Sequence, residues 1–346
     1  MTVPAVPVLR RYESFLAHNA SQVSSIESTL RSLAYVLPGR FKDAELASET
    51  LYTLLNFVGL YHDSVLSRIQ QHKPGQSQHA RYTTHLLARS GIYRKFARLV
   101  MMLGYSQVLW EMIAFRKGGN KVQWRIIILL EGLKATLRLV LLRLSSYRPL
   151  LHPPLPERDI EDSPPSIALQ SVKLPRTGLT LPSLSQTQSV NTFLLDKLLT
   201  ADDIKPPFQL VHRVQGLGRF AEILYILRPL VYALLLKRYS KKNWRPWVIG
   251  ISIDLAARNL ALRSFEQTIP GGLRALTGLE KEELRRRGRE MWWWMLRGAG
   301  YENLTKPYLE SIVQKLGTGA ILSLIGSVVG DYQYLWENYY FTTATI

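Results

Sequence analysis

The side chains that most often carry chemistry form no recognisable catalytic arrangement in this sequence. The seven histidines lack the spacing of a metal-binding motif such as HExxH, and the chain has no cysteine to supply a thiolate. Neither a GxSxG nucleophile motif nor a phosphate-binding P-loop occurs. The sequence therefore predicts a protein that is not an enzyme and that holds no cofactor or metal ion.

Two isolated features resemble functional motifs only in part. Residues 216–221 have the GxGxxA spacing of a dinucleotide-binding turn, but they lack the βαβ setting that such a turn requires. Asp254 lies in an apolar run, and a carboxylate in such a run commonly pairs with a nearby cation. We expect its partner to be Arg258, four residues later, and we do not expect catalysis at either place.

Positive charge and large apolar side chains occur together in two blocks of the chain. The net charge is +18; residues 81–148 hold 13 Lys or Arg against 2 Asp or Glu, and residues 208–300 hold 17 against 7. Both blocks are also rich in Leu, Ile, Val and Trp. This combination is typical of a surface that lies on an anionic bilayer. A nucleic-acid-binding surface needs fewer aliphatic residues, so we predict no nucleic-acid partner; steep salt dependence of RNA or DNA binding would favour that alternative.

Three segments in the second block combine cations with proline or tryptophan. An Arg-Pro pair interrupts residues 220–236, a basic hinge covers residues 237–247, and a basic turn runs directly into three tryptophans in residues 284–296. Tryptophan favours the headgroup level of a bilayer, and cations favour anionic lipid. We therefore predict that the following residues contact a membrane or a partner protein: Arg228, Pro229, Lys237, Arg238, Lys241, Lys242, Trp244, Arg245, Trp247, Arg285, Arg286, Arg287, Trp292, Trp293 and Trp294.

Each segment also has an ordinary structural interpretation. The first is consistent with a kinked core helix, the second with a solvated loop, and the third with a charged turn before a Trp-rich core helix. However, three consecutive tryptophans cannot all face one core, because successive residues of a helix point in different directions. At least one of Trp292, Trp293 and Trp294 should therefore contact lipid, a partner or an exposed groove.

The elements that must position these residues are predicted to be helices. Apolar residues recur at three- and four-residue steps, and no convincing alternating run is present. We expect an all-α, multi-helix, membrane-associated bundle. Its main helices are predicted near residues 23–37, 46–69, 82–115, 121–147, 216–239, 246–264, 279–299, 307–329 and 331–341, with a break at residues 118–120.

The prolines divide the chain into three parts. Ten of the 18 prolines lie in residues 149–207, together with many Ser, Thr and Gln residues. Proline removes a backbone donor and fixes φ, so this stretch is predicted to be a disordered linker. We therefore expect an N-terminal helical region over 1–148, the linker over 149–207, and a C-terminal helical region with the basic-aromatic segments over 208–346.

No stretch has the roughly 20 mainly apolar residues that a membrane-spanning helix needs. Ile126–Leu144 is the nearest in length, but Glu131, Lys134 and Arg138 share one side of the predicted helix. Its other side carries Leu129, Leu133, Thr136, Val140 and Leu144. We expect this helix to lie in the bilayer interface, with basic side chains at the headgroups and the aliphatic side below. A core helix with one solvated side and a span shielded within a bundle are the alternatives.

Taken in order, the three segments resemble the peroxin-16 family of peroxisomal membrane assembly proteins. The resemblance rests on Phe220–Leu236 (FAEILYILRPLVYALLL), Trp244–Trp247, the apolar run with Asp254, Glu283–Arg287, Tyr334–Phe341, Tyr35–Phe41, and Ser48, Glu49 and Tyr52 before the Leu-rich stretch to Leu66. It covers most of the chain outside the linker.

The resemblance implies a non-enzymatic scaffold or receptor in peroxisome membrane assembly and membrane-protein recruitment. Such proteins lie in the peroxisomal membrane, and some reach it through the endoplasmic reticulum. The expected partners are the membrane itself, through anionic headgroups, peroxin-3 and cargo carried by peroxin-19. The alternative is a lipid-binding or lipid-transfer helical protein that regulates membrane remodelling or division, with Glu222, Arg228 and Asp254 lining an internal pocket.

Overall fold

The computed structural model of the 346-residue chain describes residues 7–36, 44–70, 77–156, 172–173, 180–181, 201–316, 333 and 336–340. Most of these residues are helical, which confirms the all-α prediction. The first helices are α1 (Pro7–His18), α2 (Ala20–Val36), α3 (Ala44–Gln70), α4 (Gln78–Arg89) and α5 (Gly91–Leu144). Later in the chain come α7 (Ala201–Ile204), η2 (Pro207–Gln209), α8 (Leu217–Tyr239), α9 (Trp244–Thr268), η3 (Gly272–Ala275), α10 (Gly278–Glu290), η4 (Met291–Leu296), α11 (Gly298–Gly300), η5 (Tyr301–Thr305) and α12 (Lys306–Leu316).

One serine ends α4 and begins α5, so the helix predicted over residues 82–115 is divided. Ser90 is extended (φ −138°, ψ 115°), and its backbone N–H donates to the Leu86 carbonyl. Its hydroxyl accepts the backbone N–H of Tyr93 at 3.2 Å. Because one residue satisfies backbone groups of two helix ends, a break forms where the apolar pattern alone predicts continuity.

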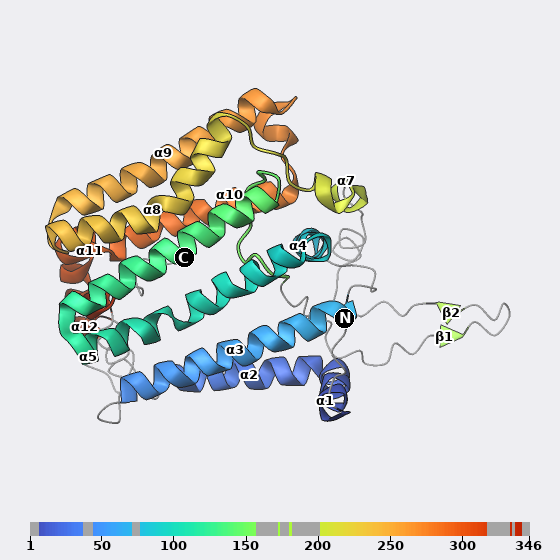
Figure 1. Cartoon of the computed structure of the whole chain (residues 1–346), viewed down its shortest axis with the longest axis horizontal. Coiled ribbons are helices and arrows are strands. Elements are labelled where there is room, and N and C mark those ends of the chain that lie inside the picture. Colours follow the sequence, from blue (N-terminus) through green and yellow to red (C-terminus); the bar gives the residue numbers. More distant parts are fainter. Residues whose placement is uncertain are drawn as a thin grey trace.

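The predicted break at residues 118–120 is confirmed, because α5 folds back on itself there (Figure 1). Gly119 has φ 63° and ψ −164°, a conformation that favours glycine. Amides then join the two arms: Gln107 donates to Glu131 at 2.8 Å, and Gln123 donates to Glu111 at 2.9 Å. We call residues 91–117 the first arm of α5 and residues 121–144 the second arm.

The start of the Pro-rich stretch packs against the helices. Leu151 is buried in a core cluster with Leu141, Val211 and Leu279, and the Arg148 side chain donates to the Val211 carbonyl at 2.9 Å. Two-residue strands, β1 (Val172–Lys173) and β2 (Thr180–Leu181), pair antiparallel. Apart from these strands, residues 157–200 lie outside the described residues, so the predicted linker is described only where it joins the helices.

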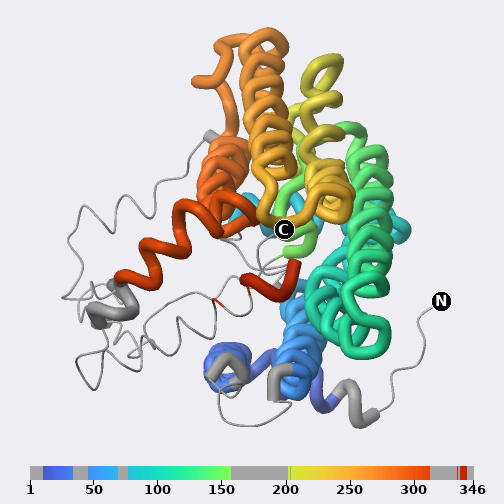
Figure 2. Tube along the Cα trace, turned by 90° about the vertical axis from the view of Figure 1, so that its left-hand side faces the viewer, coloured from blue at the N-terminus to red at the C-terminus, as the bar shows by residue number. Residues whose placement is uncertain are grey.

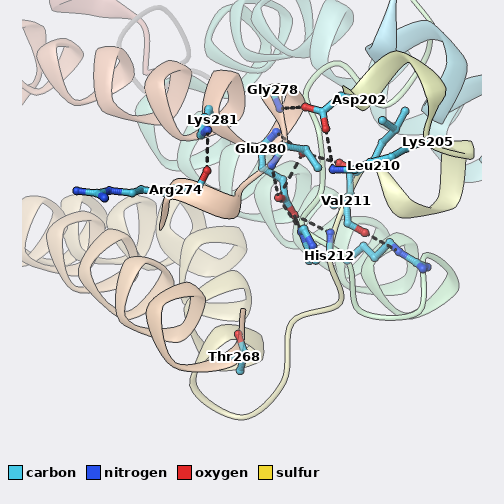
Figure 3. A network of polar contacts seen from close by, with 12 residues as sticks. Asp202, Lys205, Leu210, Val211, His212, Thr268, Arg274, Gly278, Glu280 and Lys281 are labelled. Atoms are coloured by element: carbon cyan, nitrogen blue, oxygen red, sulfur yellow. Dashed lines mark hydrogen bonds and ion pairs between the residues drawn. The ribbon is translucent and has the colours of Figure 1, made fainter. Parts of the chain in front are cut away.

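Residues at the end of the Pro-rich stretch are bonded to the start of α10 (Figure 3). Asp202 accepts the backbone N–H of Gly278 at 2.7 Å, and Glu280 accepts that of His212 at 2.6 Å. Burial alone would raise the pKa of Asp202, but hydrogen bonds from Lys205 and Gly278 outweigh burial and lower it. Thr277 and Glu280 form a capping box, which fixes where α10 begins.

The helix predicted over residues 279–299 ends at Glu290, and a 3₁₀ helix, η4, follows. Trp294 of η4 lies against Gly250 of α9, where its ring fills space that a Cβ atom would occupy. The uninterrupted helix is therefore a wrong prediction, and the 3₁₀ helix that replaces its second half carries the ring that packs on Gly250. The predicted helix from residue 307 begins at Lys306; residues 317–330 lie outside the described residues.

The long helices form one layer. In Figure 1, α3, the two arms of α5, α8 and α9 lie side by side, and neighbours in that order contact one another. Figure 2 shows α10 and α12 on one side of this layer. We call the side of the second arm of α5, α8 and α9 that faces α10 and η4 the inner side, and the opposite side the outer face.

Candidate membrane interface

The charged side chains of the second arm of α5 point into the protein. Glu131 and Lys134 are buried, with Lys134 Nζ 2.8 Å from Glu131 Oε1, and burial lowers the pKa of Lys134 although Glu131 opposes that shift. Leu129, on the opposite side of the helix, is 61% exposed. The prediction that the basic side of this helix meets headgroups is therefore wrong. The aliphatic side is the exposed one, because the charges have partners inside the fold.

A buried ion pair joins α8 to α9. Arg228 Nη1 lies 2.8 Å from Asp254 Oδ2, and Trp294 Nε1 donates to the same oxygen at 2.9 Å. All three side chains are buried, as is Pro229. The expected pairing of Asp254 with Arg258 is wrong, since Arg258 is exposed and its guanidinium instead lies 3.7 Å from the sulfur of Met291. The longer-range pair prevails because it is shielded from water.

A second network connects α10 to α8. Arg287 is 2.7 Å from Glu222 and 2.8 Å from Glu283, and Arg286 is 2.7 Å from Glu283. Arg286 also pairs with Glu290. Burial alone would raise the pKa of Glu283, but Arg287 and Arg286 outweigh burial and lower it to about 2. Arg287 is thus engaged with carboxylates inside the protein, and of the three consecutive arginines at 285–287 only Arg285 is exposed.

The two networks also bear on the lipid-pocket alternative. Glu222, Arg228 and Asp254, the residues expected to line such a pocket, are engaged in buried ion pairs with other protein groups. The hollow beside Tyr225, Asp254 and Arg287 has a volume of only about 10 Å³. No three His, Asp or Glu side chains of the described ranges converge as a metal site requires.

The basic turn between α8 and α9 remains at the surface. Lys237, Arg238, Lys242 and Arg245 are exposed, and so is Trp244, whose ring packs edge-on against Trp247 at 5.3 Å. Lys241 differs, because its ammonium donates to the Glu337 carbonyl at 2.9 Å and its pKa is lowered by burial. Four of the five predicted cations are therefore placed to meet an external ligand.

The three consecutive tryptophans divide as the sequence predicts. Trp294 is 1% exposed, whereas Trp292 is 72% and Trp293 is 39% exposed. The Trp247 indole donates to the Trp294 carbonyl at 2.8 Å, so η4 lies against the start of α9. The basic turn and two exposed indoles therefore occupy neighbouring parts of the surface.

Large apolar side chains line the outer face. On α5 they recur at steps of four and seven residues, on the side away from Glu131 and Lys134; on α8 the two lie fourteen residues apart, and on α9 Val248 and Leu255 lie seven residues apart. The exposed members are Leu129, Leu133 and Val140 on α5, Phe220 and Leu234 on α8, and Val248, Ile249 and Leu255 on α9. A water-soluble fold usually buries such residues and exposes its charges. Here three adjacent helices expose large apolar side chains while they bury Glu131, Lys134, Arg228 and Asp254, although cations such as Arg125 and Arg143 of α5 are exposed as well.

Sequence comparison identifies the family. The sequence profile described as "Peroxisomal membrane protein (Pex16)" matches residues 10–338. The chain belongs to the Pex16 family. It is 26% identical to "Peroxisome biogenesis protein 16" of Arabidopsis thaliana, over 95% of this chain and 97% of the relative. It is 22% identical to "Peroxisomal membrane protein PEX16" of Schizosaccharomyces pombe, over 87% of each chain. No solved structure matches.

Membership of the Pex16 family confirms the resemblance stated above. It makes the chain a peroxisomal membrane protein that acts in peroxisome biogenesis. Among the described helices of this Pex16-family chain, none combines the length and the apolar character that crossing a bilayer requires.

The inward-facing carboxylates are the part of the site that sequence reasoning missed. Glu222 of α8 and Glu283 and Glu290 of α10 decide which arginines of this Pex16-family chain are internal. One local signal was available, because Glu283 and Glu290 lie three or four residues from Arg286 or Arg287. Nothing local indicates that Glu222 meets Arg287, 65 residues later.

Proposed function

We propose that this chain is a non-enzymatic scaffold that attaches to the peroxisomal membrane by its outer face and recruits other membrane proteins there. The single observation that carries the proposal is the reversal of polarity across the layer. Charges are paired on the inner side, and aliphatic side chains are exposed on the outer face.

The energetics favour attachment by that face. Moving a fully exposed Leu or Val side chain from water into an apolar phase is worth about 1.5–3 kcal/mol. Several half-exposed side chains on three adjacent helices add up to a substantial driving force, before the cost of ordering the protein on the bilayer. The exposed cations and the exposed Trp244 of the α8–α9 turn fit the headgroup level at the end of that face.

The recruiting role rests on the family together with the absence of a catalytic motif in the sequence. By the resemblance given above, the partners are peroxin-3 and membrane proteins carried by peroxin-19. The lipid-transfer alternative is less well supported, since Arg228 and Asp254 pair with each other and Glu222 pairs with Arg287.

Vesicle flotation of purified protein tests the attachment. The variant L129Q/L133Q/V140Q should lose roughly tenfold or more in affinity for vesicles of phosphatidylcholine and phosphatidylserine, because it removes apolar contact from one helix. The matched control is I26Q/L30Q/L33Q, which changes three exposed apolar residues of α2. Equal losses in both variants would contradict attachment by the outer face.

The recruiting role needs a separate readout. In cells that lack the native protein, L129Q/L133Q/V140Q should fail to bring a newly made peroxisomal membrane protein to the organelle. Fusing an unrelated membrane anchor to the same variant should restore recruitment, since a scaffold needs only to be held at the membrane. An anchored variant that reaches the organelle but recruits nothing would contradict the scaffold function.

A further inference from the structure

A pocket of about 270 Å³ lies between the end of α3 and the start of α5, far along the chain from the basic-aromatic segments. Three arginines from two helices line it, Arg68 from α3 and Arg94 and Arg98 from α5. The hydroxyl-bearing Ser64 and Ser67 lie on the α3 side, and Leu87, Leu155 and Pro156 supply apolar wall. The pocket thus combines cations, hydroxyl groups and an apolar wall.

The three guanidinium groups have few protein partners. Within the described ranges, neither Arg68 nor Arg98 makes a hydrogen bond or an ion pair. Arg94 donates Nε and Nη2 to the Leu87 carbonyl, at 3.3 and 3.0 Å, which fixes its side chain and leaves Nη1 available. Asp63 also lines the pocket, but it has interactions of its own.

The arginines also act on one another. Burial lowers the pKa of Arg98, and the charges of Arg68 and Arg94 lower it further, with no carboxylate acting on Arg98 in the opposite direction. Arg228 and Arg287, by contrast, are buried and paired with carboxylates, whereas Arg68 and Arg94 are exposed and Arg98 is half-buried. Clustered arginines are a common feature of sites for phosphate groups, because a planar guanidinium can donate two hydrogen bonds to one phosphate.

We propose that this pocket binds a phosphate monoester group, with Arg94 and Arg98 as its main ligands and Arg68 as a third cation at its rim. The group can belong to a phosphorylated lipid headgroup or to a small soluble phosphate, and the recognising chemistry is the same in both. The proposal does not depend on the outer face, because a soluble ligand can occupy the pocket without membrane attachment.

Calorimetric titration with inositol trisphosphate and with inorganic phosphate tests the pocket in solution. Flotation on phosphatidylcholine vesicles with and without phosphatidylinositol phosphate tests the lipid source. The variant R94Q/R98Q should weaken inositol trisphosphate binding roughly tenfold or more, because it removes the charge-assisted hydrogen bonds. R94K/R98K, which keeps the charge but loses the bidentate geometry, should bind at an intermediate level.

The matched control is R89Q/K95Q, which removes two exposed cations from the same region without altering the pocket lining. It should bind as the native chain does, and all variants should show native circular dichroism. A lipid source is supported if phosphatidylinositol phosphate increases flotation of the native chain but not of R94Q/R98Q. A soluble source is supported if the native chain binds a soluble probe in the titration and phosphatidylinositol phosphate does not change its flotation. Equal losses in R94Q/R98Q and R89Q/K95Q, or no binding of either soluble probe together with no lipid effect, would overturn the proposal.

Discussion

The two basic-aromatic segments look alike in the sequence but lie in different environments. In residues 237–247, Lys237, Arg238, Lys242 and Arg245 remain exposed. In residues 284–296, Arg286 and Arg287 turn inward and pair with carboxylates, and Trp294 is buried. The two segments differ because only the second has acidic residues close to its arginines in the sequence. Residues 237–247 contain no Asp or Glu, whereas Glu283 and Glu290 lie within helical reach of Arg286 or Arg287.

This contrast shows how to interpret a cationic run beside tryptophans. Arg286 and Arg287 build the interior of this fold because Glu283 and Glu290, three or four residues away, are themselves buried, whereas Arg285 lies three residues from the exposed Glu282 and stays at the surface. Where carboxylates are missing, the cations are available to an external anion, here proposed to be lipid headgroups. The following predictions separate the two environments, beginning with the largest expected effect.

Removing the central cation of the buried network should destabilise the fold strongly. Arg287→Met leaves Glu222 and Glu283 buried without their main partner, which should cost about 3–5 kcal/mol in the free energy of unfolding. Chemical denaturation followed by circular dichroism measures this. Arg285→Met, two residues away and exposed, should change stability by less than about 0.5 kcal/mol. Similar losses in both variants would remove the distinction between the segments.

Within the tryptophan run, the buried and exposed indoles should behave differently. Trp294→Ala removes a ring packed on Gly250 and a hydrogen bond to Asp254, so about 3 kcal/mol of stability should be lost. Trp292→Ala should leave stability nearly unchanged and weaken vesicle binding, because its indole is available to the headgroup level. Thermal unfolding measures the change in stability, and vesicle flotation measures the change in membrane binding. Destabilisation by Trp292→Ala without weaker flotation would be contrary to this assignment.

The exposed turn should govern the electrostatic part of membrane binding. Each surface cation contributes on the order of 1 kcal/mol near an anionic bilayer, so neutralising four should weaken vesicle binding by roughly a thousandfold at low salt. This effect should shrink as salt is raised, because salt screens the attraction. The test variant is K237Q/R238Q/K242Q/R245Q.

The control for that variant neutralises four exposed arginines elsewhere. It should weaken flotation much less, since three of its positions lie in or beside α10 and one lies at the end of α9. The control variant is R263Q/R274Q/R285Q/R289Q. If both quadruple variants lost affinity equally across the salt series, overall charge rather than the α8–α9 turn would account for binding.

The buried network should also give acid sensitivity of a defined sign. The pKa of Glu283 is about 2 in the folded protein and near 4.5 without the fold, so its contribution is fully present above about pH 4.5. That contribution should disappear as the pH falls from 4.5 toward 2, while stability near neutral pH stays constant. Urea denaturation between pH 3 and 7 measures it. Glu283→Gln should be less stable at pH 7 and should show a shallower decline in acid; an unaltered decline would refute this origin.

Local pattern in the sequence was enough for much of the fold but not for the direction in which helices face. Apolar periodicity and the Gly118-Gly119 pair predict many of the helices and the break within α5 correctly. The break at Ser90 and the 3₁₀ turn after Glu290 were missed, since capping and the Trp294–Gly250 contact compete with periodicity. Which side of an amphipathic helix is buried depends on distant partners.

The second arm of α5 illustrates that limit. Its sequence separates Glu131 and Lys134 from Leu129 and Leu133, but a two-sided helix is compatible with either side facing inward. The charged side faces inward because Gln107, from the other arm, meets Glu131. The pairing of Arg228 with Asp254 likewise cannot be predicted from local sequence, because it requires α8 and α9 to lie side by side.

Depth measurement on vesicles tests the central claim, that the outer face lies in the bilayer, most directly. Because the chain has no cysteine, single variants Leu133→Cys, Leu234→Cys and Leu255→Cys can each carry one environment-sensitive fluorophore. Glu282→Cys, on the exposed side of α10, is the reference position. On binding, the three outer-face labels should be quenched by lipids with nitroxide on the acyl chain and protected from aqueous iodide, while the reference label stays open to iodide. Outer-face labels that remain quenched by iodide on fully bound protein would contradict the account.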